Sequence, residues 1–309
     1  MNDRTGTMNK KNKILIFLGT MLLFTGLIRA QEVKHVMPLG NSITLGKSNF
    51  TIPTQSAGDY TTHGYRGFLY NQIHSSIQGV TIDFTGPSAG NTENTGIAPY
   101  KGWFQDGAFI SDFHDIHNGQ PAGSKNVIQQ LNNMASPPDI ILLHIGTNDI
   151  GRIGEQESEN AVGDYNTPNT IMYDLKVLMH QLLEWKGAAG DTIEQVFLCK
   201  IIPRAPQEEY PGVNANIQDY NSKMDRFLQD DLEFFYPGRV QMVDMYSPFY
   251  ASQETYYTAD NAPQTIDDHI HPSVTGYEAM ANQFADYLSD YLTPEVRDEF
   301  QYATGPFGS

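Results

Sequence analysis

The stretch HVMPLGNSIT, from His35 to Thr44, places a serine directly after a short apolar run. A serine hydroxyl can act as a nucleophile when the fold also supplies a base, a group that orients the base and donors for an oxyanion. Asn41 and Ser42 are also residue types that end strands and cap helices. By itself this stretch favours a turn, so the remaining chain has to supply the other groups.

A candidate base lies near the other end of the chain, in DDHIHPSVTGYEAMA. Asp268 precedes His271 by three residues, and a carboxylate beside one ring nitrogen holds a histidine in the tautomer that a general base needs. The same residues suit an acidic turn before a helix that Ser273 would cap. Metal binding by Asp267, His269 and His271 is a weaker alternative, because His-x-His needs a further ligand cluster.

A third polar group follows an apolar run in HIGTNDIG, from His144 to Gly151. The side-chain amide of Asn148 is a neutral donor that would suit a developing oxyanion. Asn and Asp also form Asx turns, and taken alone the segment favours a turn. The sequence contains no Gly-x-Ser-x-Gly elbow around Ser42, no His-Glu-x-x-His, no phosphate-binding loop and no dinucleotide fingerprint.

Short apolar runs alternate with longer helical patterns between residues 35 and 292. This alternation predicts a doubly wound parallel sheet. The expected strands are residues 35–40, 80–86, 139–146, 195–202 and 239–245, and the expected helices are residues 64–76, 124–134, 169–185, 216–235 and 273–292. Ligands of such sheets bind beyond the carboxyl ends of the strands, so we expect Ser42, Asn148, Asp268 and His271 to face one crevice.

Two stretches, residues 87–123 and 246–265, lack a clear period and are rich in aromatic and turn-forming residues. Long loops of this kind usually shape a binding site. Aromatic faces stack on neutral sugars, and we expect loops of the protein to present Tyr60, Tyr65, Tyr100, Trp103, Phe104, Tyr250, Tyr256 and Tyr257. The alternative is that many of these aromatic side chains belong to the core.

Residues 1–30 have a basic start, an apolar core and a short end, which is the layout of a secretory signal peptide. We expect cleavage after Ala30, since the apolar core is short for an uncleaved membrane anchor. Residues 31–292 then form one domain and residues 293–309 a tail, because no linker, repeat or low-complexity tract interrupts the chain.

Cleavage removes five cations and one anion, which takes the formal charge from −17 to −21. Such a surface repels phosphates and anionic lipid, so nucleic acid and stable membrane association after cleavage are not expected. Cys199 is the single cysteine and lies in the apolar run VFLCKII, which indicates a buried structural thiol.

The motifs GNSIT, GTND and DxxHP, in this order, resemble those of the SGNH (GDSL-type) hydrolase superfamily of serine esterases. MPLGNSIT, YRG, IDFTG, KGW, HIGTND and HPSVTGYEAMA resemble its carbohydrate esterase branch, and the resemblance spans Val36 to Leu292. It implies Ser42 as nucleophile, His271 as base and Asp268 as the partner of that base. The implied oxyanion donors are the Ser42 N–H, a glycine N–H and the Asn148 side chain.

Two positions depart from the pattern of this superfamily. The second block is IAPYKGW here, so Gly102 is the expected glycine donor and Gly90 the alternative. Asn41 stands where the superfamily usually has Asp, and it can still accept backbone hydrogen bonds in the turn.

The resemblance implies an α/β protein with a flavodoxin-like three-layer α/β/α sandwich and a five-stranded parallel sheet. It implies a secreted or periplasmic serine esterase that removes O-acetyl groups from a polysaccharide or oligosaccharide through an acyl-serine intermediate. No metal or organic cofactor is expected, because protein groups supply the nucleophile, base and oxyanion donors. The alternatives are a lipid or short-chain acyl esterase, a thioesterase, and a non-catalytic carbohydrate-binding protein.

Overall fold

The protein is described by a computed structural model. The residues that the structure describes are 32–46, 64–76, 80–87, 101–104, 107–114, 116–117, 120–121, 126–153, 161–204, 212–252 and 270–293. By their internal contacts, the residues of the chain fall into two units, Met1–Glu32 and Val33–Ser309, and apart from Glu32, the first residue of β1, the elements below belong to the second unit. The expected signal peptide and, apart from Thr293, the expected tail lie outside the described residues, so those boundaries stay predictions.

A parallel sheet forms the centre of the fold. Its strands are β1 (Glu32–Gly40), β2 (Val80–Phe84), β3 (Trp103–Phe104), β6 (Ile140–His144), β7 (Gln195–Cys199) and β8 (Val240–Val243). The order is β2-β1-β6-β7-β8, and β3 pairs with the end of β1. This is the flavodoxin-like order. The five predicted strands are confirmed, and the two-residue strand β3 adds a sixth that local pattern did not predict.

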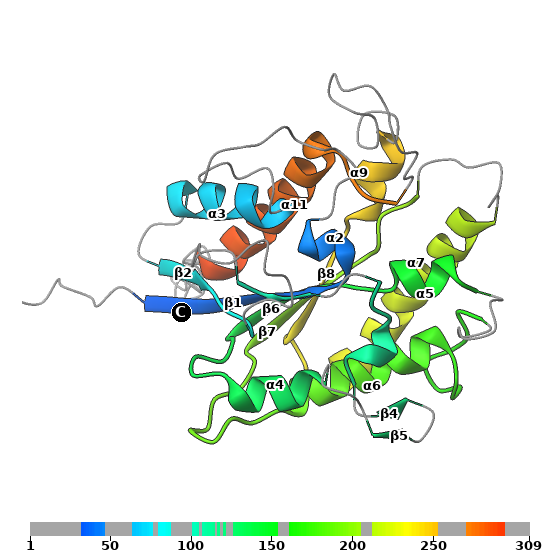
Figure 1. Ribbon diagram of the computed structural model, residues 1–309, viewed down its shortest axis with the longest axis horizontal. Helices are drawn as coiled ribbons and strands as arrows, with labels where there is room; N and C mark the ends of the chain where they lie inside the picture. Colours follow the sequence, from blue (N-terminus) through cyan, green and yellow to red (C-terminus); the bar gives the residue numbers. More distant parts are fainter. Residues whose placement is uncertain are drawn as a thin grey trace, which may run out of the picture. The chain divides into compact units, whose positions relative to one another are not determined.

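Helices cover both faces of the sheet (Figure 1). On one face lie α2 (Ser42–Leu45), α3 (Tyr65–Ser76), α9 (Tyr246–Ala251) and α11 (Val274–Leu292). On the other lie α4 (Val127–Asn133), α5 (Thr147–Gly151), α6 (Ile171–Glu184) and α7 (Val213–Phe227). The remaining elements are a 3₁₀ turn η5 (Ile110–Asp112), the hairpin β4 (Ile116–His117) and β5 (Gln120–Pro121), a π-helical turn η6 (Leu228–Leu232) and α8 (Glu233–Phe235).

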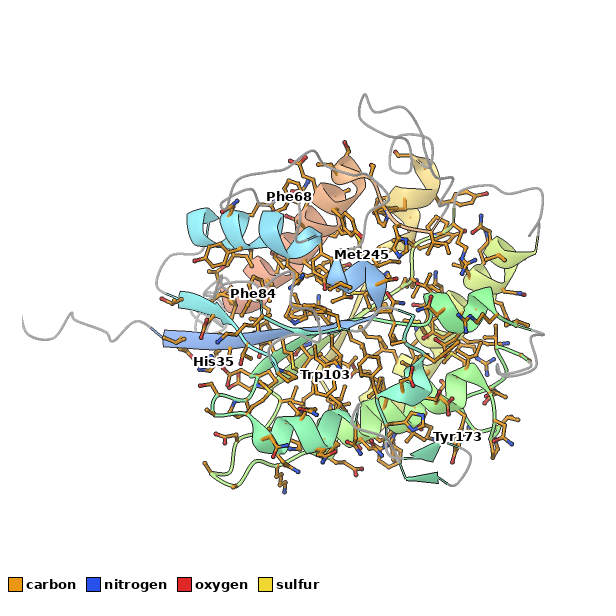
Figure 2. The ribbon with its side chains drawn as sticks, in the orientation of Figure 1. His35, Phe68, Phe84, Trp103, Tyr173 and Met245 are labelled. Atoms are coloured by element: carbon orange, nitrogen blue, oxygen red, sulfur yellow. The ribbon has the colours of Figure 1, made fainter. Side chains whose placement is uncertain are left out.

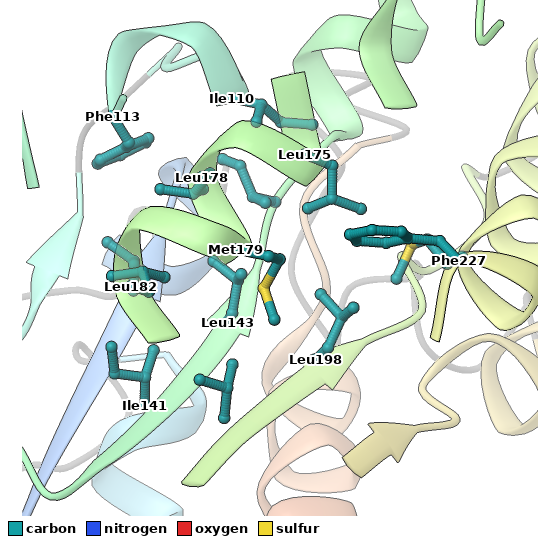
Figure 3. Packing of buried hydrophobic residues seen from close by; sticks show 14 of the residues in the cluster. Ile110, Phe113, Ile141, Leu143, Leu175, Leu178, Met179, Leu182, Leu198 and Phe227 are labelled. Atoms are coloured by element: carbon teal, nitrogen blue, oxygen red, sulfur yellow. The ribbon is translucent and has the colours of Figure 1, made fainter. Parts of the chain in front are cut away.

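The face beneath α6 is packed by side chains at helical spacing. Leu175, Leu178, Met179 and Leu182 recur at intervals of three and four residues, so they share one side of the helix. They belong to a buried cluster with Ile141 and Leu143 of β6, Leu198 of β7 and Phe227 of α7 (Figure 3). Since both faces of β6 are covered, all five of its residues are buried.

The opposite face is closed by α11 against α3. The rings of Tyr65 and Phe284 lie 4.9 Å apart between their centroids, and both side chains are fully buried. Ser273 caps α11, as its sequence position predicts, because its Oγ accepts a hydrogen bond from the N–H of Gly276 at 3.2 Å. The packed helix therefore fixes the position of His271, two residues before the cap.

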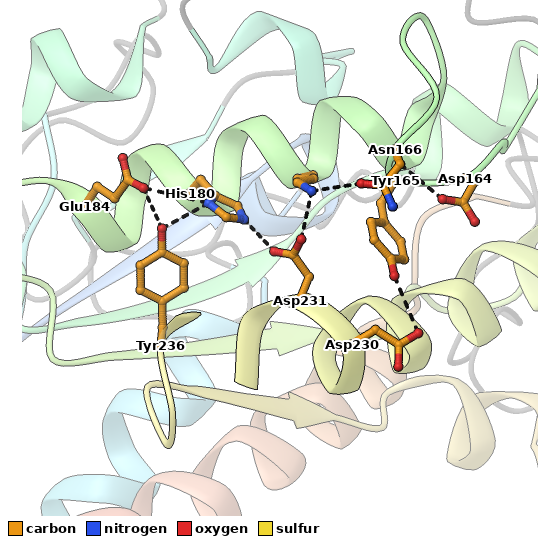
Figure 4. A network of polar contacts seen from close by, with 9 residues as sticks. Asp164, Tyr165, Asn166, His180, Glu184, Asp230, Asp231 and Tyr236 are labelled. Atoms are coloured by element: carbon orange, nitrogen blue, oxygen red, sulfur yellow. Dashed lines mark hydrogen bonds and ion pairs between the residues drawn. The ribbon is translucent and has the colours of Figure 1, made fainter. Parts of the chain in front are cut away.

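A polar network joins α6 to the turn η6 (Figure 4). The carboxylate of Asp231 lies 2.6 Å from Nε2 of His180 and 2.8 Å from Nζ of Lys176. The hydroxyl of Tyr236 donates to Glu184 at 2.7 Å and lies 3.0 Å from Nδ1 of His180. The π-helical turn brings Asp231 to α6, where it is 6% exposed.

The helix expected over residues 216–235 is confirmed, because α7, the π-helical turn η6 and α8 follow one another without a break. One expectation about local structure was wrong. Residues 246–251, expected within a loop, form α9. Among the described helices, none combines the length and the apolar character that a membrane crossing requires.

Candidate active site

Ser42 is the first residue of α2, immediately beyond the carboxyl end of β1. The Oδ1 atom of Asn41 accepts a hydrogen bond from the N–H of Ile43 at 3.1 Å, which confirms the expected role of this asparagine in the turn. The Ser42 N–H has no acceptor within the helix, because the first N–H groups of a helix precede any carbonyl partner. Ser42 is 3% exposed, so it is a buried polar residue.

His271 reaches Ser42 from the turn before α11. Its Nε2 atom lies 2.7 Å from the Oγ atom of Ser42, and the histidine is 9% exposed. A proton on Nδ1 leaves Nε2 free to accept the serine proton, which is the geometry of a nucleophile with its general base. Asp268, the expected partner of His271, lies outside the described residues, so its role stays a prediction.

Asn148 is the second residue of α5, the short helix that follows β6. Gly146, which caps α5, has φ +115°, and a Cβ there would lie 2.9 Å from the ring of Tyr220, so only glycine fits. The Nδ2 atom of Asn148 donates to the carbonyl of Ala108 at 2.9 Å. Because an amide group carries two N–H bonds, the second remains outside that contact. The oxyanion role of Asn148 stays a prediction. The hydrogen bond to Ala108 holds the side chain that would perform it.

Asp149, the next residue, makes a hydrogen bond to the same segment, residues 108–110, that Asn148 contacts. Its Oδ1 atom accepts a hydrogen bond from the N–H of Ile110 at 3.1 Å, and it is 3% exposed. Burial raises the pKa of this carboxyl to about 7. The side chains of Asn148 and Asp149 therefore connect the start of α5 to the backbone of Ala108 and Ile110 by hydrogen bonds. Sequence reasoning placed Asp149 only in an Asx turn, because its partner lies 39 residues away.

Gly102 is buried and directly precedes β3. Since Trp103 and Phe104 pair with Leu39 and Gly40, Gly102 lies beside the end of the strand that leads to Ser42. Its role as an oxyanion donor stays a prediction. The alternative, Gly90, lies outside the described residues.

The aromatic residues expected on loops have different places. Tyr65 is a fully buried residue of α3, so its assignment to a sugar-binding loop was wrong. Trp103 is half-buried on the α6 side of the sheet, opposite Met245, with its ring centroid 6.3 Å from that of Phe113 (Figure 2). Tyr250 is 55% exposed and stacks on Tyr246. Tyr60, Tyr100, Tyr256 and Tyr257 lie outside the described residues.

Within the described ranges, no three His, Cys, Asp or Glu residues are grouped as a metal site. Asp267 and His269 lie outside those ranges, so the metal alternative stays untested. Cys199 is fully buried, and burial raises the pKa of its thiol well above the usual range, which agrees with a structural role.

Comparison with known proteins yields a family match over most of the chain. The family model described as GDSL-like lipase/acylhydrolase matches residues 36–284. A multidomain esterase of Ruminococcus flavefaciens is 24% identical over 266 residues, which cover 83% of this chain and 28% of the relative. The chain thus spans less than a third of that curated relative.

Two solved structures share the fold across their full length. A carbohydrate esterase family 3 structure from Talaromyces cellulolyticus has a TM-score of 0.53 and 19% identity, and the similarity covers 84% of this chain and 98% of that one. A family 3 carbohydrate esterase of Clostridium thermocellum has a TM-score of 0.51 and 20% identity over the same shares. At these identities the similarity shows the fold.

Proposed function

Because the chain belongs to the GDSL-like lipase/acylhydrolase family, we propose that it is an ester hydrolase that removes O-acetyl or other short acyl groups from polysaccharides or oligosaccharides. The observation that carries the proposal is the 2.7 Å contact between Oγ of Ser42 and Nε2 of His271. Both groups are buried beyond the carboxyl end of β1, where doubly wound folds bind ligands.

In this mechanism Nε2 of His271 takes the hydroxyl proton as Oγ of Ser42 attacks the acyl carbon of the ester. The negative charge that develops on the acyl oxygen is stabilised by the N–H groups of Ser42 and Gly102 and by the Asn148 amide. His271 then gives the proton to the sugar oxygen as its bond to the acyl carbon breaks. Water, deprotonated by His271, releases the acid and restores the Ser42 hydroxyl. Asp268 would stabilise the imidazolium formed in both steps.

The sugar in this proposal is supported by the names of the structural relatives and by the acidic composition. Both structures described above are carbohydrate esterases, which makes a sugar-bound ester the first substrate to test. A formal charge of −17 disfavours anionic lipid surfaces and phosphates as partners. Export directed by residues 1–30 is part of the proposal and would place the enzyme where polysaccharides are found.

The test is release of acetate from acetylated xylan by the purified chain, compared with hydrolysis of 4-nitrophenyl acetate and 4-nitrophenyl octanoate. We expect acetate release from the polysaccharide and preference for acetate over octanoate, both absent in Ser42→Ala. Preference for octanoate would instead indicate a lipid esterase. Binding of xylan without hydrolysis of any ester would indicate a carbohydrate-binding protein and contradict the proposal.

A further inference from the structure

Arg66 is a charged residue in the interior, where it is 1% exposed. Removing a guanidinium from water is costly unless its N–H groups and its charge find partners. Nη2 of Arg66 donates to the carbonyl of Leu45 at 3.0 Å, and Cζ lies 4.0 Å from the ring centroid of Phe104. Burial lowers the pKa of Arg66 to about 10, which leaves the guanidinium charged at neutral pH.

The first partner of Arg66 is the end of the nucleophile helix. Leu45 is the last residue of α2, and Ser42 is the first, so about 6 Å of helix separates the two ends. Gly64, two residues before Arg66, lies so close to Gly46 that a Cβ on Gly64 would be 2.5 Å from the Gly46 Cα. This close approach brings the start of α3 against the end of α2.

The second partner of Arg66 is the strand beside the nucleophile. The ring of Phe104 lies against Gly102, since a Cβ on Gly102 would be 2.8 Å from the Cε1 atom of that ring. Phe104 pairs with Gly40 at the end of β1. The guanidinium of Arg66 therefore contacts the helix that begins with Ser42. It also contacts the ring of Phe104, which in turn lies against the backbone of Gly102.

We infer that Arg66 is a positioning residue for ester hydrolysis, which fixes the Ser42 helix relative to the Gly102 segment. The inference rests on the proposed function, because it assigns both elements to the reacting site. Nucleophile and oxyanion donors must be held to within a fraction of an ångström, and a displacement of about 1 Å costs about 10²-fold in rate. The planar guanidinium suits the task, since it can donate in its plane while its face stacks on a ring.

The test compares Arg66→Met with Arg239→Met in hydrolysis of 4-nitrophenyl acetate. Arg239 is a matched control, because its guanidinium also donates to backbone carbonyls, those of Leu183 and Ile193, and lies 6.0 Å from the ring centroid of Tyr236. It lies at the amino end of β8, away from the carboxyl ends of the strands. We expect Arg66→Met to lower kcat about 10²-fold with little change in KM.

Arg239→Met should lower the thermal midpoint while kcat stays within about twofold of the wild type. An equal loss of kcat in both variants would overturn the inference, because it would reflect general loosening of the fold. A wild-type kcat in a folded Arg66→Met protein would also overturn the inference.

Phe104→Leu keeps the contact between Arg66 and Leu45 and removes the ring, so it tests the inference even if Arg66→Met does not fold. We expect kcat to fall about tenfold with KM unchanged, and the labelling rate of Ser42 by a fluorophosphonate to fall in proportion. In the double variant the losses should not add, because both substitutions break one connection. Wild-type kcat and labelling in Phe104→Leu, or additive losses, would count against the inference.

The same measurements separate this inference from the proposed function. If the wild type hydrolyses 4-nitrophenyl acetate but releases no acetate from acetylated sugars, the substrate proposal fails and the role of Arg66 is still decided by the variants. If the wild type shows neither turnover nor labelling of Ser42, both fail, since no reacting site is present to be positioned.

Discussion

The Oγ atom of Ser42 and the Nε2 atom of His271 lie 2.7 Å apart, although 229 positions of sequence separate the two residues. The contact joins the start of α2 to the turn before α11, and it depends on the packing of α11 against α3. With Ser42 as the nucleophile and His271 as the base, the two residues are both required, one to attack the ester and the other to accept the proton.

Ser42→Ala removes the nucleophile and leaves the cap of α2 on Asn41 in place. We expect kcat for 4-nitrophenyl acetate to fall by about 10⁴-fold or more. The thermal midpoint should stay within about 2 °C of the wild type, because one hydroxyl is lost and no backbone contact changes. Retention of substantial turnover in this folded variant would exclude the acyl-serine mechanism.

His271→Ala should be as damaging as Ser42→Ala, because the serine loses the proton acceptor that lies 2.7 Å from its Oγ atom. His269→Ala serves as its control and should keep substantial activity. Treatment with a chelator should leave the wild type unchanged. Activity that chelation removes and a divalent ion restores would favour the metal alternative for Asp267, His269 and His271.

Asn148→Ala tests the oxyanion role against the structural role of the same side chain. The amide is already held by the carbonyl of Ala108 at 2.9 Å, so its second N–H has a fixed direction. We expect kcat to fall about 10²- to 10³-fold with KM little changed. Asn126→Ala is the control, because the Asn126 Oδ1 caps α4 by accepting from the N–H of Gln129 at 3.0 Å.

Asn126→Ala should cost about 1 kcal/mol of stability and leave kcat unchanged. A reversed pattern, in which Asn148→Ala loses stability and keeps its kcat, would identify Asn148 as a turn former only.

The burial of His144 predicts that the free energy of unfolding depends on pH. The imidazole is fully buried, neither ring nitrogen has a hydrogen-bond partner among the described residues, and burial lowers its pKa to about 4. Between pH 6.5 and about 4 the unfolded chain binds a proton that the folded protein does not. Stability from this group is therefore complete above pH 6.5 and decreases as the pH falls, by about 1.4 kcal/mol per unit.

His144→Leu removes this titration and keeps an apolar side chain in the core. Urea unfolding at pH 7.5, 5.5 and 4.5 should show that the variant loses less free energy of unfolding on acidification than the wild type. Equal losses would mean that other groups govern the acid sensitivity and that His144 titrates normally in the folded protein.

Asp231→Asn is expected to weaken the connection between α6 and η6 without affecting catalysis. Its carboxylate lies against His180 and Lys176, and charged hydrogen bonds of this kind contribute about 2 kcal/mol. Asp230→Asn is the control, because Asp230 is exposed and accepts a single long hydrogen bond from Tyr165 at 3.4 Å. The midpoint of thermal unfolding should fall only in Asp231→Asn, while kcat stays at the wild-type value in both. Lower kcat in Asp231→Asn would contradict a purely structural network.

Local features of the sequence were enough to predict the layers of the fold and to select candidate site residues. Apolar runs buried on both faces mark β6 and β7, helical spacing marks α6, and Ser273 marks the start of α11. These patterns depend on residues within a few positions of one another, so they can be recognised in the sequence without knowledge of the fold. The order of strands and motifs then places Ser42 and Asn148 beyond the ends of neighbouring strands.

Contacts between distant segments were decided only by the tertiary structure. The sequence shows Arg66 as part of a YRG motif, but its partners Leu45 and Phe104 lie 21 and 38 positions away, and β3 is too short for any period to reveal. Asp149 likewise finds Ile110 only when the η5 segment packs on α6. Such contacts depend on which surfaces meet when the core closes, and a periodic pattern carries no information about that choice.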